Sequence, residues 1–316
     1  MLIVENLVDL LAGVDFSVTS KERLMLAFDH NILFLDEPTL IEIPQKELET
    51  IVVKKVPYMS LKEVFKLRSP WVEMTKRRVR YYSNQPFSSH DTPQVWGLEI
   101  EGVMTLVWYS HQKTIYYIPK KHYSVEYLVF WVLHTFLPLL FFFENRYHIL
   151  HASGVQVGEK AILFSAFSGG GKSTLTEYFI HQGHSIFGDD TIALSTLDKG
   201  YNVVASYPFY RPFRVPECLG YHIKNFVSIP KRLHCLYRLK RASATASIEI
   251  CPLEGIEKFR AIYQSMFITF EYFKKERYAL AIDMAKTMQV FQIIIPWDKN
   301  RLDEVYDTIV AHNLMH

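Results

Sequence analysis

Cysteine is scarce in this chain, and its few thiols follow no metal-binding or disulfide pattern. Only three cysteines occur, Cys218, Cys235 and Cys251, and an odd number cannot all pair with one another. Their scattered positions also lack the short paired spacing of structural zinc sites. The scarcity therefore excludes a disulfide scaffold and a cysteine-based zinc fold, and it predicts reduced thiols in a cytoplasmic protein.

A surplus of charge is missing as well. The sequence has 35 Lys and Arg against 33 Asp and Glu, which leaves a net charge of +2 at pH 7. Nothing in this balance favours a nucleic-acid partner. The one local basic cluster, Lys76–Arg80, is interpreted as a solvated face.

The sequence has no basic start followed by a long apolar core, so no signal peptide is expected. One apolar run, Tyr127–Phe143, approaches the length of a membrane span. His134 and Pro138 interrupt this run, and acidic residues flank it closely. We therefore interpret it as a buried helix, kinked or ended near Pro138, and expect no stable membrane span.

The length of 316 residues, 49% of them hydrophobic, is enough for two domains. Residues 1–122 are predicted to form a β-rich N-terminal domain, which supports the other domain or docks a substrate. Residues 123–316 alternate between strands and helices and are predicted to form an α/β catalytic domain. Strands are expected at Ile32–Leu35, Ile51–Val53, Gln94–Ile100, Thr105–Tyr109 and Val290–Ile295, and a capping box at Ser60–Glu63 predicts a short helix.

The most informative segment is the glycine-rich loop Ala166–Thr174, with the sequence AFSGGGKST. It follows the apolar run Ile162–Phe164 and precedes an amphipathic segment, the strand–loop–helix context of a phosphate-binding loop. The pattern G-x-x-x-x-G-K-[ST] is met except at its first position, which is Ala166. The residues predicted to bind a nucleotide are Ser168, Gly169, Gly170, Gly171, Lys172, Ser173 and Thr174, with Ser173 also offering a hydroxyl to a metal ion.

A hairpin is predicted upstream of this loop. The segment Ile149–Phe164 is expected to turn at Gly158–Lys160. Continued antiparallel pairing would place His151 opposite roughly Phe167, with its imidazole directed at the terminal phosphate. The alternative is a core histidine that is satisfied by a backbone carbonyl.

Two adjacent acids, Asp189 and Asp190, follow the short apolar strand His184–Phe187. In phosphate-loop folds this strand normally runs parallel to the strand that feeds the loop, so both end at the same edge. Adjacent carboxylates repel each other unless a cation or a proton lies between them. One acid holding Mg²⁺ while the other accepts the proton of an incoming hydroxyl is a kinase arrangement. The alternatives are an Asx turn or the single metal-binding acid of an NTPase.

The order and spacing of these motifs resemble the catalytic domain of HPr kinase/phosphorylase. The resemblance covers His151–Val155, Ser168–Ser173 and Gly183–Asp190, within residues 147–195. It implies a phosphate-loop fold of the phosphoenolpyruvate-carboxykinase-like type, with ATP and Mg²⁺ as cofactors. The catalytic residues that it implies are His151, Lys172, Asp189 and Asp190, and the implied metal ligands are Ser173 and Asp190.

The departures from that family are informative. Thr174 stands where HPr kinases usually have Glu, and the E-I-R-G-x-G stretch after the acidic pair is replaced by Tyr207–Glu217. The chain therefore resembles the HPr-kinase-like branch that accompanies ribosomally made peptides, including kinases of lasso-peptide precursors. By position, Glu217 is a candidate second metal ligand, and Arg211 and Arg214 are candidate substrate contacts. The alternative is a surface loop with an incidental arginine pair.

The leading hypothesis is an ATP- and Mg²⁺-dependent serine kinase of a peptide, with the C-terminal serine of a lasso-peptide precursor as the acceptor. One alternative is a kinase of a free small molecule such as serine. Another is a non-catalytic, nucleotide-gated peptide-binding protein, although a pure binder needs no second carboxylate. A GTPase is not expected because no N-K-x-D element occurs. The sequence leaves a homo-oligomer open.

Overall fold

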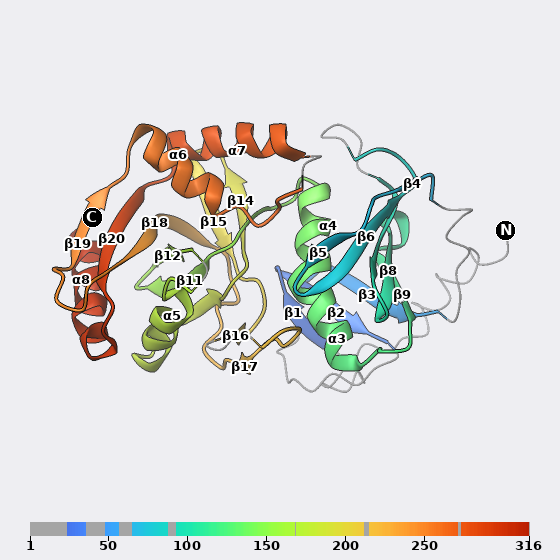
Figure 1. Cartoon of the computed structure of the whole chain (residues 1–316), viewed down its shortest axis with the longest axis horizontal. Helices are drawn as coiled ribbons and strands as arrows, with labels where there is room; N and C mark the ends of the chain where they lie inside the picture. The colour runs from blue at the N-terminus through green and yellow to red at the C-terminus, as the bar shows by residue number, and fades with distance from the viewer. Residues whose placement is uncertain are drawn as a thin grey trace.

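Runs of β-branched and aromatic residues build most of this protein, which is a mixed, sheet-rich α/β structure (Figure 1). We describe a computed structural model, which covers residues 24–35, 48–56, 65–87, 93–167, 169–211, 215–270 and 273–315. Within these ranges the strands form two nine-stranded sheets and one two-stranded ribbon. The predicted capping box at Ser60–Glu63 lies outside the described residues.

The first sheet uses only the N-terminal part of the chain. Its strands pair in the order β1-β2-β3-β9-β8-β7-β6-β4, and β5 pairs with β6. The strands predicted near residues 32–35, 51–53, 94–100 and 105–109 are confirmed as β2, β3, β7 and β8. The bounds are β1 Leu24–Ala27, β2 His30–Phe34, β3 Thr50–Lys55, β4 Leu67–Arg68, β5 Val72–Met74, β6 Arg77–Ser83, β7 Val95–Ile100, β8 Met104–Tyr109 and β9 Thr114–Pro119.

The apolar run after this sheet is one continuous helical segment, made of α3 (Val125–Phe130), the π-helical η2 (Trp131–Phe136) and α4 (Leu137–Phe143). It is long and apolar enough to cross a membrane, but 67% of its apolar window is buried inside the structure. The prediction of a buried helix is therefore confirmed. The helix continues past Pro138, whose missing N–H leaves a carbonyl of the preceding turn without a partner, and the π-helical turn lies there.

This helical segment shares its hydrophobic core with the first sheet. Trp96 of β7 stacks on Phe136 with 4.3 Å between ring centroids, and both residues belong to the core that contains β1, β2 and β9. The segment nevertheless follows residue 122, where the sequence predicts a domain boundary. The division into domains 1–122 and 123–316 stays a prediction.

The second sheet positions the candidate site. Its strands pair in the order β10-β14-β15-β18-β12-β11-β13, with β20 beside β18 and β19 beside β20. β12, β18 and β20 are parallel neighbours, and β11 is antiparallel to both β12 and β13. The bounds of this sheet are β10 His148–Leu150, β11 Ser153–Val157, β12 Lys160–Ser165, β13 Ile186–Gly188, β14 Ile192–Leu197, β15 Gly200–Val204, β18 Lys231–Ala242, β19 Glu249–Pro252 and β20 Val290–Pro296. The two-stranded ribbon consists of β16 (Phe209–Tyr210) and β17 (Tyr221–His222).

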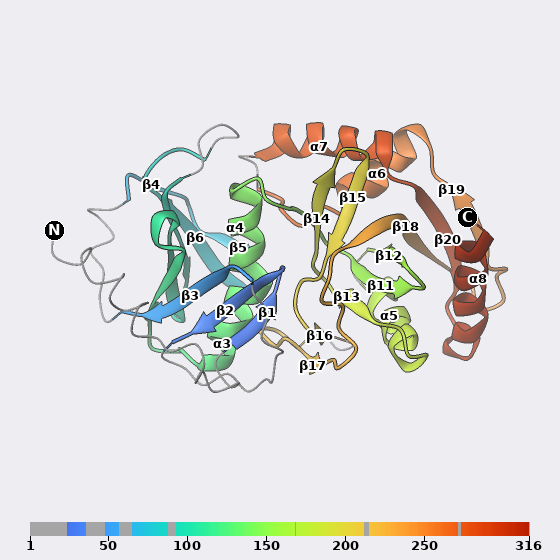
Figure 2. The same cartoon turned by 180° about the vertical axis from the view of Figure 1, so that it is seen from behind.

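Helices cover both faces of this sheet, as Figure 2 shows from behind. Side chains of β12 alternate between the two faces, so Ile162 packs under α5 and α8 while Leu163 packs under α6 and α7. The four helices are α5 (Lys172–His181), α6 (Gly255–Gln264), α7 (Lys274–Thr287) and α8 (Leu302–Met315). Because β12 and β13 point in the same direction, the segments that follow them emerge at one edge of the sheet, as the sequence predicted.

Candidate active site

The glycine-rich loop connects β12 to α5, and its backbone geometry depends on glycine. Gly169 and Gly171 have φ angles of +73° and +92°, a region that residues with a Cβ rarely adopt, and Gly171 caps α5. A Cβ added to Gly170 would lie 2.5 Å from the Cβ of Ala166 and 2.8 Å from the carbonyl oxygen of Phe167. Ala166 therefore fits at the first motif position because Gly170 has no side chain. Ser168 lies outside the described residues.

We expect Gly170→Ala to weaken ATP binding about tenfold or more, because relieving an overpacked contact costs about 1–3 kcal/mol. The loop would have to shift away from Ala166 and Phe167, which changes the backbone conformation that would meet the phosphates. Calorimetric titration with ATP and Mg²⁺ measures the change. Gly158→Ala is the matched control, since that turn glycine also has a positive φ but an added Cβ there meets nothing. Equal affinities of both variants and the original chain would contradict the expectation.

The acidic pair lies at the end of β13. Asp189 is fully buried and accepts hydrogen bonds from four donors. These are the Ser153 hydroxyl, the Ser173 hydroxyl at 3.3 Å, and the backbone N–H groups of Asp190 and Arg211 at 3.1 Å each. A carboxylate held by four donors has a fixed orientation. Asp189 therefore suits a positioning role.

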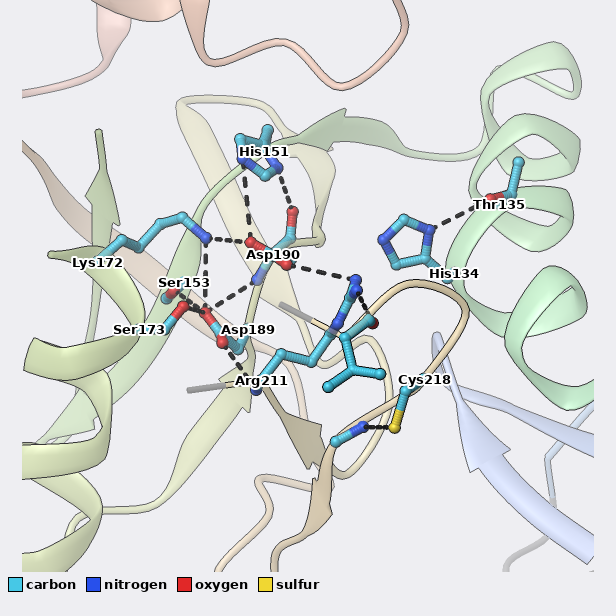
Figure 3. A network of polar contacts seen from close by, with 12 residues as sticks. His134, Thr135, His151, Ser153, Lys172, Ser173, Asp189, Asp190, Arg211 and Cys218 are labelled. Carbon is cyan, nitrogen blue, oxygen red and sulfur yellow. Dashed lines mark hydrogen bonds and ion pairs between the residues drawn. The ribbon is translucent and has the colours of Figure 1, made fainter. Parts of the chain in front are cut away.

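Asp190 faces cations instead (Figure 3). Its Oδ1 lies 2.6 Å from the Lys172 Nζ, and its Oδ2 lies 3.6 Å from the Nη1 of Arg211. The same Lys172 Nζ is 3.5 Å from Asp189 Oδ1, so one ammonium group serves both acids. Asp190 itself has a φ of +71°, a strained value for a residue with a side chain. The predicted convergence of Lys172, Asp189 and Asp190 is present in the structure.

His151 also lies at this cluster, but not for the reason that the sequence suggested. The hairpin turns at Gly158 and Glu159 as predicted, yet its pairing ends at Ser153 opposite Phe164. The chain before Ser153 leaves β12, and β10 pairs with β14 instead. The expectation that continued pairing carries His151 opposite Phe167 is therefore wrong.

A hydrogen bond brings His151 to the site. Its Nδ1 lies 2.9 Å from the backbone oxygen of Asp190. Since a carbonyl can only accept, Nδ1 carries the proton, and the Nε2 of a neutral ring is the acceptor nitrogen. That Nε2 is 3.9 Å from Asp190 Oδ1. The imidazole therefore lies beside Asp190 of the acidic pair.

The loop between β16 and β17, which contains Arg211 and Glu217, contributes only in part to the site. Arg211 is buried, packs over the Phe130 ring at 5.4 Å and donates to the backbone oxygen of Val215. Glu217 instead accepts hydrogen bonds from Arg77 at 2.6 Å and from the Trp131 indole at 2.8 Å. Glu217 therefore ties this loop to the first sheet and its helix, and its assignment as a metal ligand stays a prediction. Arg214 lies outside the described residues.

The oxygen donors at the site fit Mg²⁺ in kind. Mg²⁺ usually takes one or two carboxylates together with phosphate oxygens of the substrate, rather than a cage made only of protein groups. The Ser173 hydroxyl and the acidic pair supply such donors next to the loop. Over the described ranges no group of three or more His, Cys, Asp or Glu side chains is arranged to hold a metal ion.

Two further residues lie near the site, His134 and Arg238, which the sequence motifs do not include. His134, noted only as an interruption of an apolar run, projects from η2 toward Arg211 (Figure 3) and stacks on Phe130 at 4.7 Å. Burial, together with the charge of Arg211, lowers the pKa of His134 to about 3, so the ring is neutral at neutral pH. A single histidine within an apolar run was the available signal in the sequence.

Arg238 is the second. It lies on the strand β18. Arg238 is buried, pairs in register with Ser165 at the end of β12, and packs over the Phe167 ring at 4.2 Å. Burial lowers the pKa of Arg238. This strand end places a guanidinium group beside the glycine-rich loop.

Comparisons with known proteins add little to this geometry. The sequence matches no protein-family model and no curated protein. Among solved structures, the chain is similar to the HPr(Ser) kinase/phosphatase from Coxiella burnetii, with 14% sequence identity and a TM-score of 0.33. The alignment covers 53% of this chain and 97% of that chain. A likeness at this level carries no inference about activity, so the functional assignment rests on this chain's own residues.

Proposed function

We propose that this chain is an ATP- and Mg²⁺-dependent kinase that transfers the γ-phosphoryl group to a serine hydroxyl of a peptide. The observation that carries the proposal is the cluster of Lys172, Asp189 and Asp190 at the start of the helix that follows a glycine-rich loop. A phosphate-binding loop alone fits many NTPases. A second carboxylate beside it favours a kinase, because Asp190 can accept a proton while four donors hold Asp189 in place.

Each residue then has a distinct task. The N–H groups of the loop and the N-terminus of α5 bind the phosphates. Lys172 neutralises charge on the transferring group, and Ser173 with an acid of the pair holds Mg²⁺, which supplies further charge neutralisation when bound. Asp190 accepts the serine proton while the serine oxygen bonds to the γ-phosphorus and the bond to the ADP leaving group breaks. His151 flanks Asp190 on the other side and supports the developing charge.

The acceptor is proposed from the motif pattern. The resemblance to HPr-kinase-like enzymes of lasso-peptide biosynthesis supports a peptide with a C-terminal serine. Arg211, and Arg214 in the same loop, are proposed to contact its carboxylate or phosphate group. We further propose that the β-rich N-terminal domain docks the peptide and that the protein acts in the cytoplasm, without a nucleic-acid partner and with or without self-association.

A direct test incubates the purified chain with ATP, Mg²⁺ and a precursor peptide that ends in serine, and measures the peptide mass. We expect the peptide to gain the mass of one phosphate, and the same peptide ending in alanine to gain none. Addition of free serine in excess separates the peptide kinase from a small-molecule kinase, because only the latter would lose peptide signal and phosphorylate serine. If ATP binds but no hydroxyl acceptor gains phosphate, the kinase proposal is wrong and the nucleotide-gated binding protein is favoured.

A further inference from the structure

A pocket opens between the glycine-rich loop and the end of β20. Its volume is about 130 Å³. The acidic pair, His151 and Arg211 are not among its lining residues. The lining residues are Gly171, Thr174 and Leu175 from the loop and α5, the segment Ile295–Lys299 at the end of β20, and Leu302 and Val305 from α8.

Trp297 is the unusual member of this lining. It is 54% exposed, although the indole ring is the largest apolar side chain available to a core. Its backbone is fixed by a hydrogen bond from its N–H to the carbonyl of Ala242, and the guanidinium group of Arg241 packs over its ring at 3.3 Å. Core packing does not explain an anchored, half-exposed indole at the mouth of a pocket. An indole in this position can instead stack on a flat ligand.

The ring also contacts the phosphate-binding loop. A Cβ placed on Gly171 would lie 3.6 Å from the six-membered ring of Trp297, so the indole reaches the residue that caps α5. β12 and β20 lie on either side of β18 in a parallel arrangement, and ligands of such sheets bind at the carboxyl ends of the strands. The pocket and the loop therefore belong to one ligand path.

The walls suit an aromatic ring. Ile295, Leu302 and Val305 supply apolar surface, and Thr174 supplies a hydroxyl at the loop side. The volume is close to that of an engineered apolar cavity of about 150 Å³ that accepts benzene. The charged residues Asp298 and Lys299 also line the pocket, beside these apolar walls.

We propose that this pocket binds the purine base of the nucleotide, stacked against Trp297, while the triphosphate follows the loop from Gly171 to Lys172. This inference rests on the proposed nucleotide-binding function and deepens it. It assigns to Trp297, Leu175 and Leu302 a role that the phosphate-loop motif does not contain. It also predicts that the base contributes to affinity independently of the phosphates.

The experiment compares ATP with inorganic tripolyphosphate, which has the phosphates but no base. Binding of each ligand with Mg²⁺ is measured by calorimetry for the original chain, Trp297→Ala and Trp297→Phe. We expect Trp297→Ala to weaken ATP binding about five- to hundredfold, the range for loss of one base–aromatic stack. Tripolyphosphate binding should stay within about twofold, and Trp297→Phe should restore most of the ATP affinity because a phenyl ring also stacks. Trp71→Ala is the matched control, since that indole likewise packs against an arginine, Arg80, at 4.3 Å in the first part of the chain.

The outcomes are distinct. Unchanged ATP affinity in Trp297→Ala would overturn the base site and leave the kinase proposal standing. Equal loss of ATP and tripolyphosphate binding would also overturn it, since Trp297 would then only support the loop. If neither ligand binds the original chain, the proposed nucleotide-binding function itself is wrong. Selective loss of ATP binding, with rescue by Trp297→Phe, supports the base site.

Discussion

Asp190→Asn is expected to lower the rate of phosphoryl transfer by about 10²–10⁴-fold, the usual contribution of a positioned general base. The amide has the shape of the carboxylate but cannot accept the serine proton. ATP affinity should be equal or higher, because Lys172, now 2.6 Å from Asp190 Oδ1, would be released from that carboxylate. Single-turnover transfer to a serine peptide and calorimetry with ATP measure the two quantities separately.

Asp189→Asn is the matched control, because it changes the neighbouring acid in the same way. Four donors point at Asp189, and the amide nitrogen of an asparagine would face at least one of them. An unsatisfied buried donor costs about 1–3 kcal/mol. We therefore expect a lower free energy of unfolding in urea for Asp189→Asn than for Asp190→Asn. If Asp190→Asn retains transfer while Asp189→Asn loses it at unchanged stability, the roles of the two acids are reversed.

The parts of the site that the sequence predicted are those coded by local patterns. The loop Ala166–Thr174 is recognisable because its glycines, Lys172 and Ser173 act within nine consecutive positions. The acidic pair was predicted at the same sheet edge as the loop, on the expectation that the two preceding strands are parallel. In the structure β12 and β13 do share a direction. His151 was selected correctly as a residue of this region, but through an assumed register. A strand that changes partners, as the chain does between β10 and β11, leaves no mark in a hydrophobic pattern.

The parts that the sequence did not predict depend on long-range partners. Glu217 follows the acidic pair in sequence, and this position made it a candidate second metal ligand. In the structure Arg77, 140 positions earlier, binds its carboxylate, and the Trp131 indole donates to it as well. Such a pairing joins two parts of the chain whose distance in space is fixed only by the packed fold. The sequence also did not predict the place of Arg238. Its strand, β18, is rich in charged residues and has no clear alternation of apolar and polar side chains.

The anchoring of Glu217 has a consequence for how the two large sheets cooperate. The segment from Arg211 to Glu217 begins at the acidic pair and ends on β6 and η2 of the other core. His134 projects from the same η2 toward Arg211. The Arg211 guanidinium group also packs over the ring of Phe130 in α3, which shares its core with the first sheet. This supports a role for the N-terminal part of the chain in organising the acceptor side of the site.

Lys172→Ala is expected to impair both stability and catalysis. Lys172 is only 5% exposed and is the cation shared by Asp189 and Asp190, so its loss leaves two buried carboxylates with much less compensation. Removal of one partner of a buried ion pair costs about 3–5 kcal/mol, which urea denaturation of Lys172→Ala would detect as a lower midpoint. The rate of phosphoryl transfer by folded Lys172→Ala should also be about 10²–10³-fold lower than that of the original chain, as expected for loss of one preorganised charge donor.

The double variant Lys172→Ala/Asp190→Asn separates these two effects. Removal of the Asp190 charge relieves the carboxylate repulsion, so part of the lost stability should return, while phosphoryl transfer stays strongly reduced. A matched measurement on Lys172→Ala/Asp283→Asn controls for the general effect of removing a carboxylate, since Asp283 lies exposed on α7 and pairs with Lys286. If the double variant is no more stable than Lys172→Ala alone, charge repulsion within the pair is not what Lys172 compensates. The lysine would then act mainly on the nucleotide, and the close Lys172–Asp190 contact would contribute little to folding.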